Sequence, residues 1–199
     1  MGAGRGGRTA GRPRLTFGRG HGVRTGRTLG GMSNYTIPGL SEGDGKQLVD
    51  LLQERLTAYN DLHLILKHAH WNVVGRSFIG VHEMIDPQVD LVRGFADDVA
   101  ERIAALGGSA IGTPASHVEG REPLEYPVNR GTTTQHLTAL NKVYDQVVAD
   151  VRAAIEAAGK VDPVTEDLLT GQSFELEKFQ WFVRAHLEDG QGNIDSENA

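Results

Sequence analysis

Four long segments of the chain repeat apolar residues at alternating spacings of three and four, the period of an α-helix that buries one face. In one of them Ile85, Val89, Val92 and Ala96 follow this pattern. Strand-like alternation is almost absent. The four segments are residues 45–72, 78–106, 133–158 and 163–188. The pattern predicts an all-α protein built as a four-helix bundle.

The links between these segments differ in length, and the difference constrains the topology. Residues 73–77 and 159–162 are short links that contain glycine, as expected between antiparallel neighbours. Residues 107–132 instead form a long connection rich in glycine and proline. A long crossover between helices two and three is typical of the ferritin-like fold. Pro87 interrupts the second segment and is expected to kink that helix.

Charge is distributed unevenly along the chain. Residues 1–31 hold eleven glycines and no acidic residue, whereas the rest holds 13 basic and 26 acidic residues, a net charge of −13. We expect a flexible arm at 1–31, the bundle at 32–190 and an acidic tail at 191–199. Translation from Met32, which would leave the arm out, is an open alternative. The arm carries seven arginines: Arg5, Arg8, Arg12, Arg14, Arg19, Arg24 and Arg27.

Composition excludes several kinds of site. The chain has no cysteine, so disulfides, thiolate nucleophiles and cysteine-bound metals are excluded, and His, Asp and Glu remain as strong metal ligands. No apolar run approaches the roughly 18 residues of a membrane helix, so we expect a soluble protein. The G-x-S-x-G, H-E-x-x-H and phosphate-loop motifs are absent, which argues against a hydrolase.

Two polar pairs lie four residues apart on the second helix: His82 with Asp86, and Asp97 with Glu101. Residues four apart share one face of a helix. At about 100° per residue, these side chains fall about 60° to 160° from Ile85, outside the apolar stripe. Each pair alone is more often a solvated surface than a metal site.

The distance between the pairs indicates that a second chain is needed. Asp86 and Asp97 lie about 16 Å apart along the helix, too far for one metal ion. If two copies of this helix pack antiparallel about a two-fold axis, residues whose numbers have the same sum face each other. The sum is 183 for Asp86 with Asp97 and also for His82 with Glu101. One axis near residues 91 and 92 would therefore assemble a metal site at a dimer interface.

The end of the first helix supplies further candidates. His70 is a natural additional metal ligand, although a core histidine on an apolar stripe is the alternative. Trp71 either packs in the core or donates electrons close to oxidising iron. We expect His63 to be an interior histidine satisfied by hydrogen bonds, and His68 to be an exposed side chain without a role.

Two imidazoles and three carboxylates form an oxygen-rich ligand set that suits Fe(II), and Mn or Zn could occupy the same geometry. Five ligands cannot saturate two metal ions, so open positions would remain for water or an oxidant. No Glu is followed by His three residues later. The chain therefore lacks the motif of a di-iron site inside a single bundle, which agrees with a site at an interface.

With these residues in view, the chain resembles the Dps family, the DNA-binding proteins from starved cells, also called mini-ferritins. The resemblance covers roughly Tyr35 to Glu188 and rests on the stretches HWNVVG, FIGVHEMID and DDVAERIAALGG. Actinobacterial-type members look most similar, through TIPGLS, YNDLHL, DPQVDLVRG and EKFQWFVRAHLE. The resemblance implies a ferritin-like bundle with a short extra helix in the crossover, assembled as a hollow dodecamer.

The resemblance also implies a ferroxidase centre at the two-fold interface. Fe(II) would be oxidised there, preferentially by hydrogen peroxide, and the Fe(III) product would be stored as mineral in the cavity. Trp71 matches the family's tryptophan beside the centre. The family's ligand positions fall on His70, His82 and Asp86 of one subunit and on Asp97 and Glu101 of its neighbour.

DNA binding in this family usually depends on basic tails. Here the C-terminal end is acidic, so we expect the seven arginines of the arm to bind DNA without sequence preference, in the cytoplasm at the nucleoid. Three alternatives stay open: a nucleoid-structuring DNA-binding protein with a vestigial metal site, a mini-ferritin that does not bind DNA, and an arm that serves as a targeting peptide.

Overall fold

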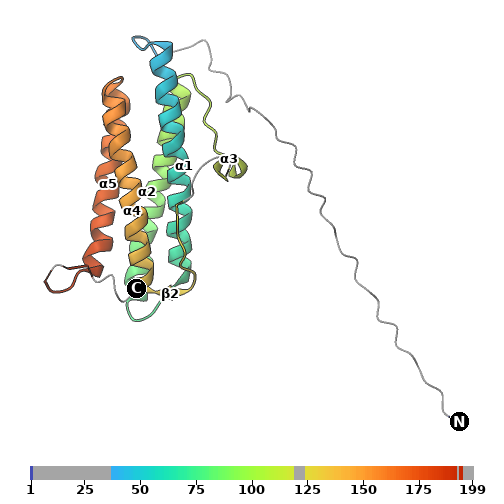
Figure 1. Ribbon diagram of the computed structural model, residues 1–199, viewed down its shortest axis with the longest axis vertical. Helices are drawn as coiled ribbons and strands as arrows, with labels where there is room; N and C mark the ends of the chain where they lie inside the picture. Colours follow the sequence, from blue (N-terminus) through green and yellow to red (C-terminus); the bar gives the residue numbers. More distant parts are fainter. Residues whose placement is uncertain (2–36, 119–123, 192, 195–199) are drawn as a thin grey trace.

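A computed structural model describes residue 1 and residues 37–118, 124–191 and 193–194. Four long helices lie side by side in a bundle (Figure 1). They are α1 (Glu42–Asn72), α2 (Phe78–Ala105), α4 (Thr133–Gly159) and α5 (Pro163–Leu187). The predicted four-helix, all-α class is confirmed. Pro87 does not end the second helix, because α2 continues through it.

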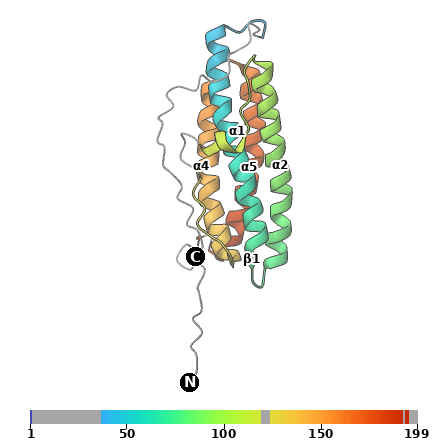
Figure 2. The same ribbon diagram turned by 90° about the vertical axis from the view of Figure 1, so that its right-hand side faces the viewer.

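The helices pack as two pairs, α1 with α2 and α4 with α5. The turned view in Figure 2 shows α1 between α4 and α2, with α5 behind it. The apolar stripes of all four helices meet in one core of fully buried side chains, among them Leu52, Leu66, Ile85, Ile103, Leu140 and Leu176. None of the described helices combines the length and the apolar character needed to cross a membrane.

Two tyrosine–glutamine pairs are among the polar side chains buried in the bundle. The Tyr59 hydroxyl donates to Gln172 Oε1 at 3.0 Å, and the Tyr144 hydroxyl donates to Gln88 Oε1 at 2.7 Å. Asp162, at the start of α5, is the one buried carboxylate among the described residues. The interior of the described bundle therefore offers no pair of carboxylates for a metal, unlike an intra-bundle di-iron site.

The described parts of the crossover between α2 and α4, residues 107–118 and 124–132, lie on the outside of the bundle, and the first of them carries the short helix α3 (Pro114–Val118) beside α1 (Figure 1). The crossover ends in β2 (Gly131–Thr132), which pairs in parallel with β1 (Val73–Val74), directly after α1. The periodicity of the sequence did not predict this two-residue ladder, since it is too short to produce an alternating pattern.

The helix starts follow from local capping residues. Thr132 and Gln135 form a reciprocal capping box at the start of α4. Asp162 accepts hydrogen bonds from the first turn of α5, where Pro163 occupies the position that lacks a helical N–H partner. The link from α1 to α2 turns at Gly75, whose φ of +113° favours glycine. That turn returns the chain so that the end of α1 lies beside the start of α2.

Candidate metal centre

His70 and His82 face each other at the joined ends of α1 and α2. Their rings stack with centroids 3.6 Å apart and planes 22° apart. Nδ1 of His70 lies 3.0 Å from the carbonyl oxygen of His82, and Nδ1 of His82 lies 2.9 Å from the carbonyl oxygen of His70. The main-chain carbonyl of each residue therefore fixes the orientation of the other residue's ring.

These two contacts determine the tautomer of each ring. A carbonyl oxygen only accepts hydrogen bonds, so each Nδ1 must carry the proton and donate it. In a neutral imidazole the other nitrogen, Nε2, then keeps its lone pair. This arrangement is the usual one around metal-binding histidines, in which a backbone carbonyl orients the ring. Both histidines are thus prepared to donate Nε2 to a metal ion.

Asp86 lies next to this pair, one turn after His82 on α2. Its Oδ1 is 3.2 Å from Nδ1 of His70 and 2.6 Å from Nζ of Lys67. The hydrogen bond from Lys67 lowers the pKa of Asp86, and the nearby imidazoles act in the same direction. Asp86 therefore stays a carboxylate to a lower pH than an ordinary aspartate, and its side chain remains 49% exposed.

Lys67 was not among the sequence-predicted residues. Its position, three residues before His70 on α1, places it on the same helix face, and this spacing was the signal that could have identified it. Its ammonium group supplies one positive charge to a carboxylate that is a candidate metal ligand. A metal cation bound by Asp86 would therefore compete with the Lys67 ammonium group for the same carboxylate.

Asp97 and Glu101 lie farther along α2, on its exposed surface. The structure brings His70, His82 and Asp86 together but leaves these two acids apart from them. Across residues 37–118 and 124–191, no group of three or more His, Asp or Glu side chains is arranged to hold a metal ion. A single chain thus presents a partial ligand set at the joined ends of α1 and α2. Two further exposed carboxylates, Asp97 and Glu101, lie farther along α2.

The remaining candidates near the end of α1 have different surroundings from those expected. Trp71 is 69% exposed, so it does not pack in the core of this chain. His63 is half-buried and lines a surface groove instead of lying in the interior. His68 is also half-buried, and its Nε2 lies 2.9 Å from the Val128 carbonyl oxygen. The expectation that His68 is an exposed residue without a role is wrong, because it anchors the crossover.

A second polar cluster fastens the crossover to the bundle. The Tyr126 hydroxyl lies 2.5 Å from Nδ1 of His136, which is fully buried in α4. The ring of His68 approaches Tyr126 edge-on. Burial lowers the pKa of His136, so this histidine is neutral at pH 7. The cluster is structural in this chain, since it joins the crossover to α1 and α4.

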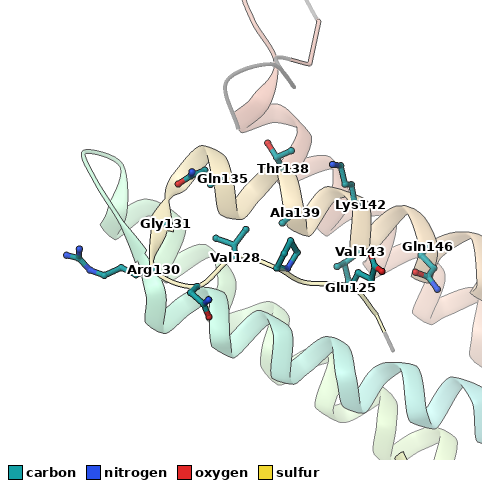
Figure 3. Close-up of a pocket in the computed structure, with 12 residues that line it drawn as sticks. Glu125, Val128, Arg130, Gly131, Gln135, Thr138, Ala139, Lys142, Val143 and Gln146 are labelled. Carbon is teal, nitrogen blue, oxygen red and sulfur yellow. The ribbon is translucent and has the colours of Figure 1, made fainter. Parts of the chain in front are cut away.

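A hollow of about 680 Å³ lies between the end of the crossover and α4. Figure 3 shows its walls, with Arg130 extending away from the other lining residues. Among the described residues that line it, Glu125 is the one carboxylate and none is a histidine. A lone carboxylate does not make an iron site, so the chemistry of this hollow differs from that of the His70–His82 pair.

The predicted seven arginines of the arm and the boundaries of the arm lie outside the described residues. The acidic tail is described only in part, at residue 191 and residues 193–194. These expectations therefore stay predictions.

Comparison with known proteins places the chain in a family. The ferritin-like domain model matches residues 49–192. The "DNA protection during starvation protein" of Mycolicibacterium smegmatis is 57% identical over 166 residues, which cover 83% of this chain and 91% of that protein. The "fine tangled pili major subunit" of Haemophilus ducreyi is 49% identical over 162 residues, covering 81% and 86%.

Solved structures agree with the sequence matches. DpsA14 from Streptomyces coelicolor superposes with a TM-score of 0.80 and 57% identity, covering 83% of this chain and 98% of that one. Fold and sequence thus agree over most of the chain. This protein belongs to the ferritin-like proteins and, among them, to the Dps family.

Proposed function

We propose that this chain oxidises Fe(II) at a site shared by two subunits, stores the Fe(III) product in a hollow dodecamer and thereby protects DNA from oxidative damage. The observation that carries the proposal is the stacked His70–His82 pair, in which each Nδ1 donates to a carbonyl oxygen and each Nε2 keeps its lone pair for a metal ion. The Asp86 carboxylate lies next to the pair, 3.2 Å from Nδ1 of His70. Membership of the Dps family supports the assignment of iron as the metal.

The shared site would use residues from two copies of α2. His70, His82 and Asp86 of one subunit would bind Fe(II) together with Asp97 and Glu101 of the partner. The exposed position of these two acids leaves them available to a second chain. A ligand set of nitrogen and oxygen donors suits Fe(II), and its open positions admit an oxidant. The site would be completed only by assembly.

Hydrogen peroxide is the oxidant that we propose. Each peroxide molecule takes one electron from each of two Fe(II) ions and, with two protons, yields two water molecules and two Fe(III) ions. This stoichiometry consumes Fe(II) and peroxide together, so hydroxyl radical does not form. Trp71 is exposed beside His70, where it could donate an electron if an iron site were left short of one.

A mixing experiment tests whether the site is shared. His82→Asn and Asp97→Asn subunits should each lose the rapid rise in ferric absorbance after Fe(II) and peroxide are added. In mixed dimers, His82 of one chain meets Asp97 of the other and one of two sites is intact. With random pairing, about a quarter of the wild-type rate should return. A mixture no faster than its components would contradict a shared site.

The alternative function is a nucleoid-structuring protein with a vestigial metal site. The measurement of ferric absorbance distinguishes it from an iron-oxidising protein. Stopped-flow absorbance of the unaltered protein would then show no ferric product above the rate in buffer. Native mass spectrometry of the unaltered protein tests the dodecamer separately, since a monomer would leave the proposed site incomplete.

We also propose that the arm at 1–31 binds DNA and so locates the protein at the nucleoid in the cytoplasm. The body from residue 32 onward has a net charge of −13 and should repel phosphate, whereas seven arginines can neutralise phosphates without reading bases. Deleting residues 1–31 should abolish salt-sensitive retardation of duplex DNA in gels. Equal retardation by both proteins would refute a role for the arm.

A further inference from the structure

Two charged residues on α2 lie between the proposed ligand pairs and have no ion-pair partner in the described part of the chain. Asp90 and Arg93 are both exposed, and neither makes a hydrogen bond or ion pair with another described residue. At about 100° per residue they fall about 140° and 80° from Ile85, within the same face as the candidate ligands. This face is therefore charged along its length.

The positions of Asp90 and Arg93 have the symmetry of the shared site. Their numbers add up to 183, the same sum that relates Asp86 to Asp97. A two-fold axis that joins the ligand pairs would therefore also bring Asp90 of each subunit to Arg93 of the other. Each residue of this pair lies about 2 Å along the helix from the axis, closer than any ligand.

We propose that two reciprocal ion pairs, each between Asp90 of one subunit and Arg93 of its partner, set the register in which the shared iron site forms. The proposal rests on the function proposed above and adds the residues that align the two subunits. Asp90 and Arg93 would be positioning residues, since neither is a metal ligand.

Electrostatics explain why such a pair is needed. Without metal, the same packing would set the Asp86 carboxylate of one subunit against the Asp97 carboxylate of the other, and like charges across an interface are costly. Arg93 is the one basic residue between Glu83 and Glu101 on α2. Its pairing with Asp90 would supply attraction at the centre of an otherwise acidic face, before any iron binds.

Arg93 lies in an open groove on the surface of the described chain. Arg93 lines this groove of about 480 Å³ together with Asn60, His63, Asp97 and Ala100. The partner's Asp90 would enter this groove beside the guanidinium group. Because the groove also contains Asp97, the ion pair and the metal ligand would lie on one continuous surface.

Charge reversal tests the pairing. Asp90→Arg would set two arginines against each other at both ends of the axis, and Arg93→Asp would do the same with two aspartates. Each variant alone should raise the dimer dissociation constant about tenfold or more in metal-free buffer, by native mass spectrometry and sedimentation. The double variant D90R/R93D restores both pairs with their charges exchanged and should assemble as the unaltered protein does.

A mixture of the two single variants gives the sharpest result. The arginine introduced in one chain would meet the aspartate introduced in the other, and the two native residues would meet as before. The mixed dimer should therefore form as the unaltered protein does, although each variant alone pairs with itself only weakly. Asp98→Arg is the matched control, because Asp98 is exposed on α2 but lies about 220° from Ile85, off this face. It should assemble normally, and helix content should be unchanged throughout.

The outcomes separate this inference from the function proposed above. Normal self-assembly of Asp90→Arg and Arg93→Asp, or failure of the mixture and the double variant to recover, would overturn the ion pair while leaving the shared site intact. Loss of the shared site itself would appear instead as an unaltered protein that stays monomeric with or without Fe(II).

Discussion

The His70 and His82 rings lie 3.6 Å apart, and each donates its Nδ1 proton to the main-chain carbonyl of the other residue. This reciprocity means that the two histidines are oriented by backbone that belongs to the α1–α2 hairpin itself. The geometry of the candidate ligands therefore depends on how the hairpin turns, as well as on the histidines.

Replacing Gly75 by alanine should disturb both histidines without touching either. Gly75 has a φ of +113°, which an L side chain rarely adopts, so Gly75→Ala should lower the free energy of unfolding by about 1–2 kcal/mol. Zn(II) affinity, measured by calorimetry as a redox-inert probe, should fall with it. Gly171→Ala, in α5 with open space around it, should be neutral or slightly stabilising.

Removing the ammonium group of Lys67 should strengthen metal binding. Its Nζ lies 2.6 Å from the Asp86 carboxylate, where it would repel an incoming cation. Lys67→Met should raise the pKa of Asp86 toward its ordinary value and tighten Zn(II) binding at pH 7 by about threefold to tenfold. Lys46→Met, which removes an exposed i,i+4 partner of Asp50, should leave binding unchanged. Weaker binding in the Lys67 variant would show that Lys67 assists the metal.

Asp162 should contribute stability that disappears in acid. Burial acts to raise its pKa, but hydrogen bonds from Thr165 and Arg102 outweigh burial and lower it. The folded state therefore binds this proton less tightly than the unfolded chain, so the contribution is complete above about pH 4 and is lost as the pH falls further.

Asp162→Asn should consequently lower the free energy of unfolding at pH 7 by about 2–3 kcal/mol, through the weakened cap and the lost charge-assisted bonds. The variant should also lose less stability than the unaltered protein between about pH 4 and pH 2. Urea unfolding across this range measures both effects. Glu156→Gln, in an exposed pair with Lys160, should change stability by no more than about 0.5 kcal/mol.

Acid should also loosen the crossover, over a higher pH range. Burial lowers the pKa of His136, so the folded state resists protonation that the unfolded chain accepts below about pH 6.5. Stability is then lost as the pH falls through this value. Amide exchange at residues 124–131, corrected for its intrinsic pH dependence, should accelerate. In His136→Gln this acid response should shrink, whereas His186→Gln, on the exposed end of α5, should keep it.

The fold was predictable because its strongest constraint is periodic. The stripe through Ile85, Val92 and Val99 extends over many helical turns, so burial of that face outweighs local exceptions such as Pro87. The Gly75 turn and the long crossover then limit the topology. The ladder between Val73 and Gly131 was not predictable, since it arises from tertiary proximity of two short segments.

The candidate site was predictable only in part. Helical spacing identified His82 with Asp86, which the structure places beside His70, because helical geometry converts residue numbers into positions. Their relation to Asp97 across a two-fold axis stays a prediction. Lys67 and the role of His68 were missed, since each depends on a contact across elements: Lys67 with α2, and His68 with the crossover at Val128. Helical periodicity predicts on which face of its helix a side chain lies, but it does not predict which residue of another element the side chain contacts.

The parallel pairing of β1 with β2 gives the bundle a mechanical property. It ties Val73 and Val74, which follow His70 within four residues, to Gly131 and Thr132, where α4 begins. A displacement of the end of the crossover would thus be transmitted through this ladder to the hairpin that carries the stacked imidazoles. A partner that bound the crossover would therefore contact a segment that is hydrogen-bonded to the hairpin of the candidate metal ligands.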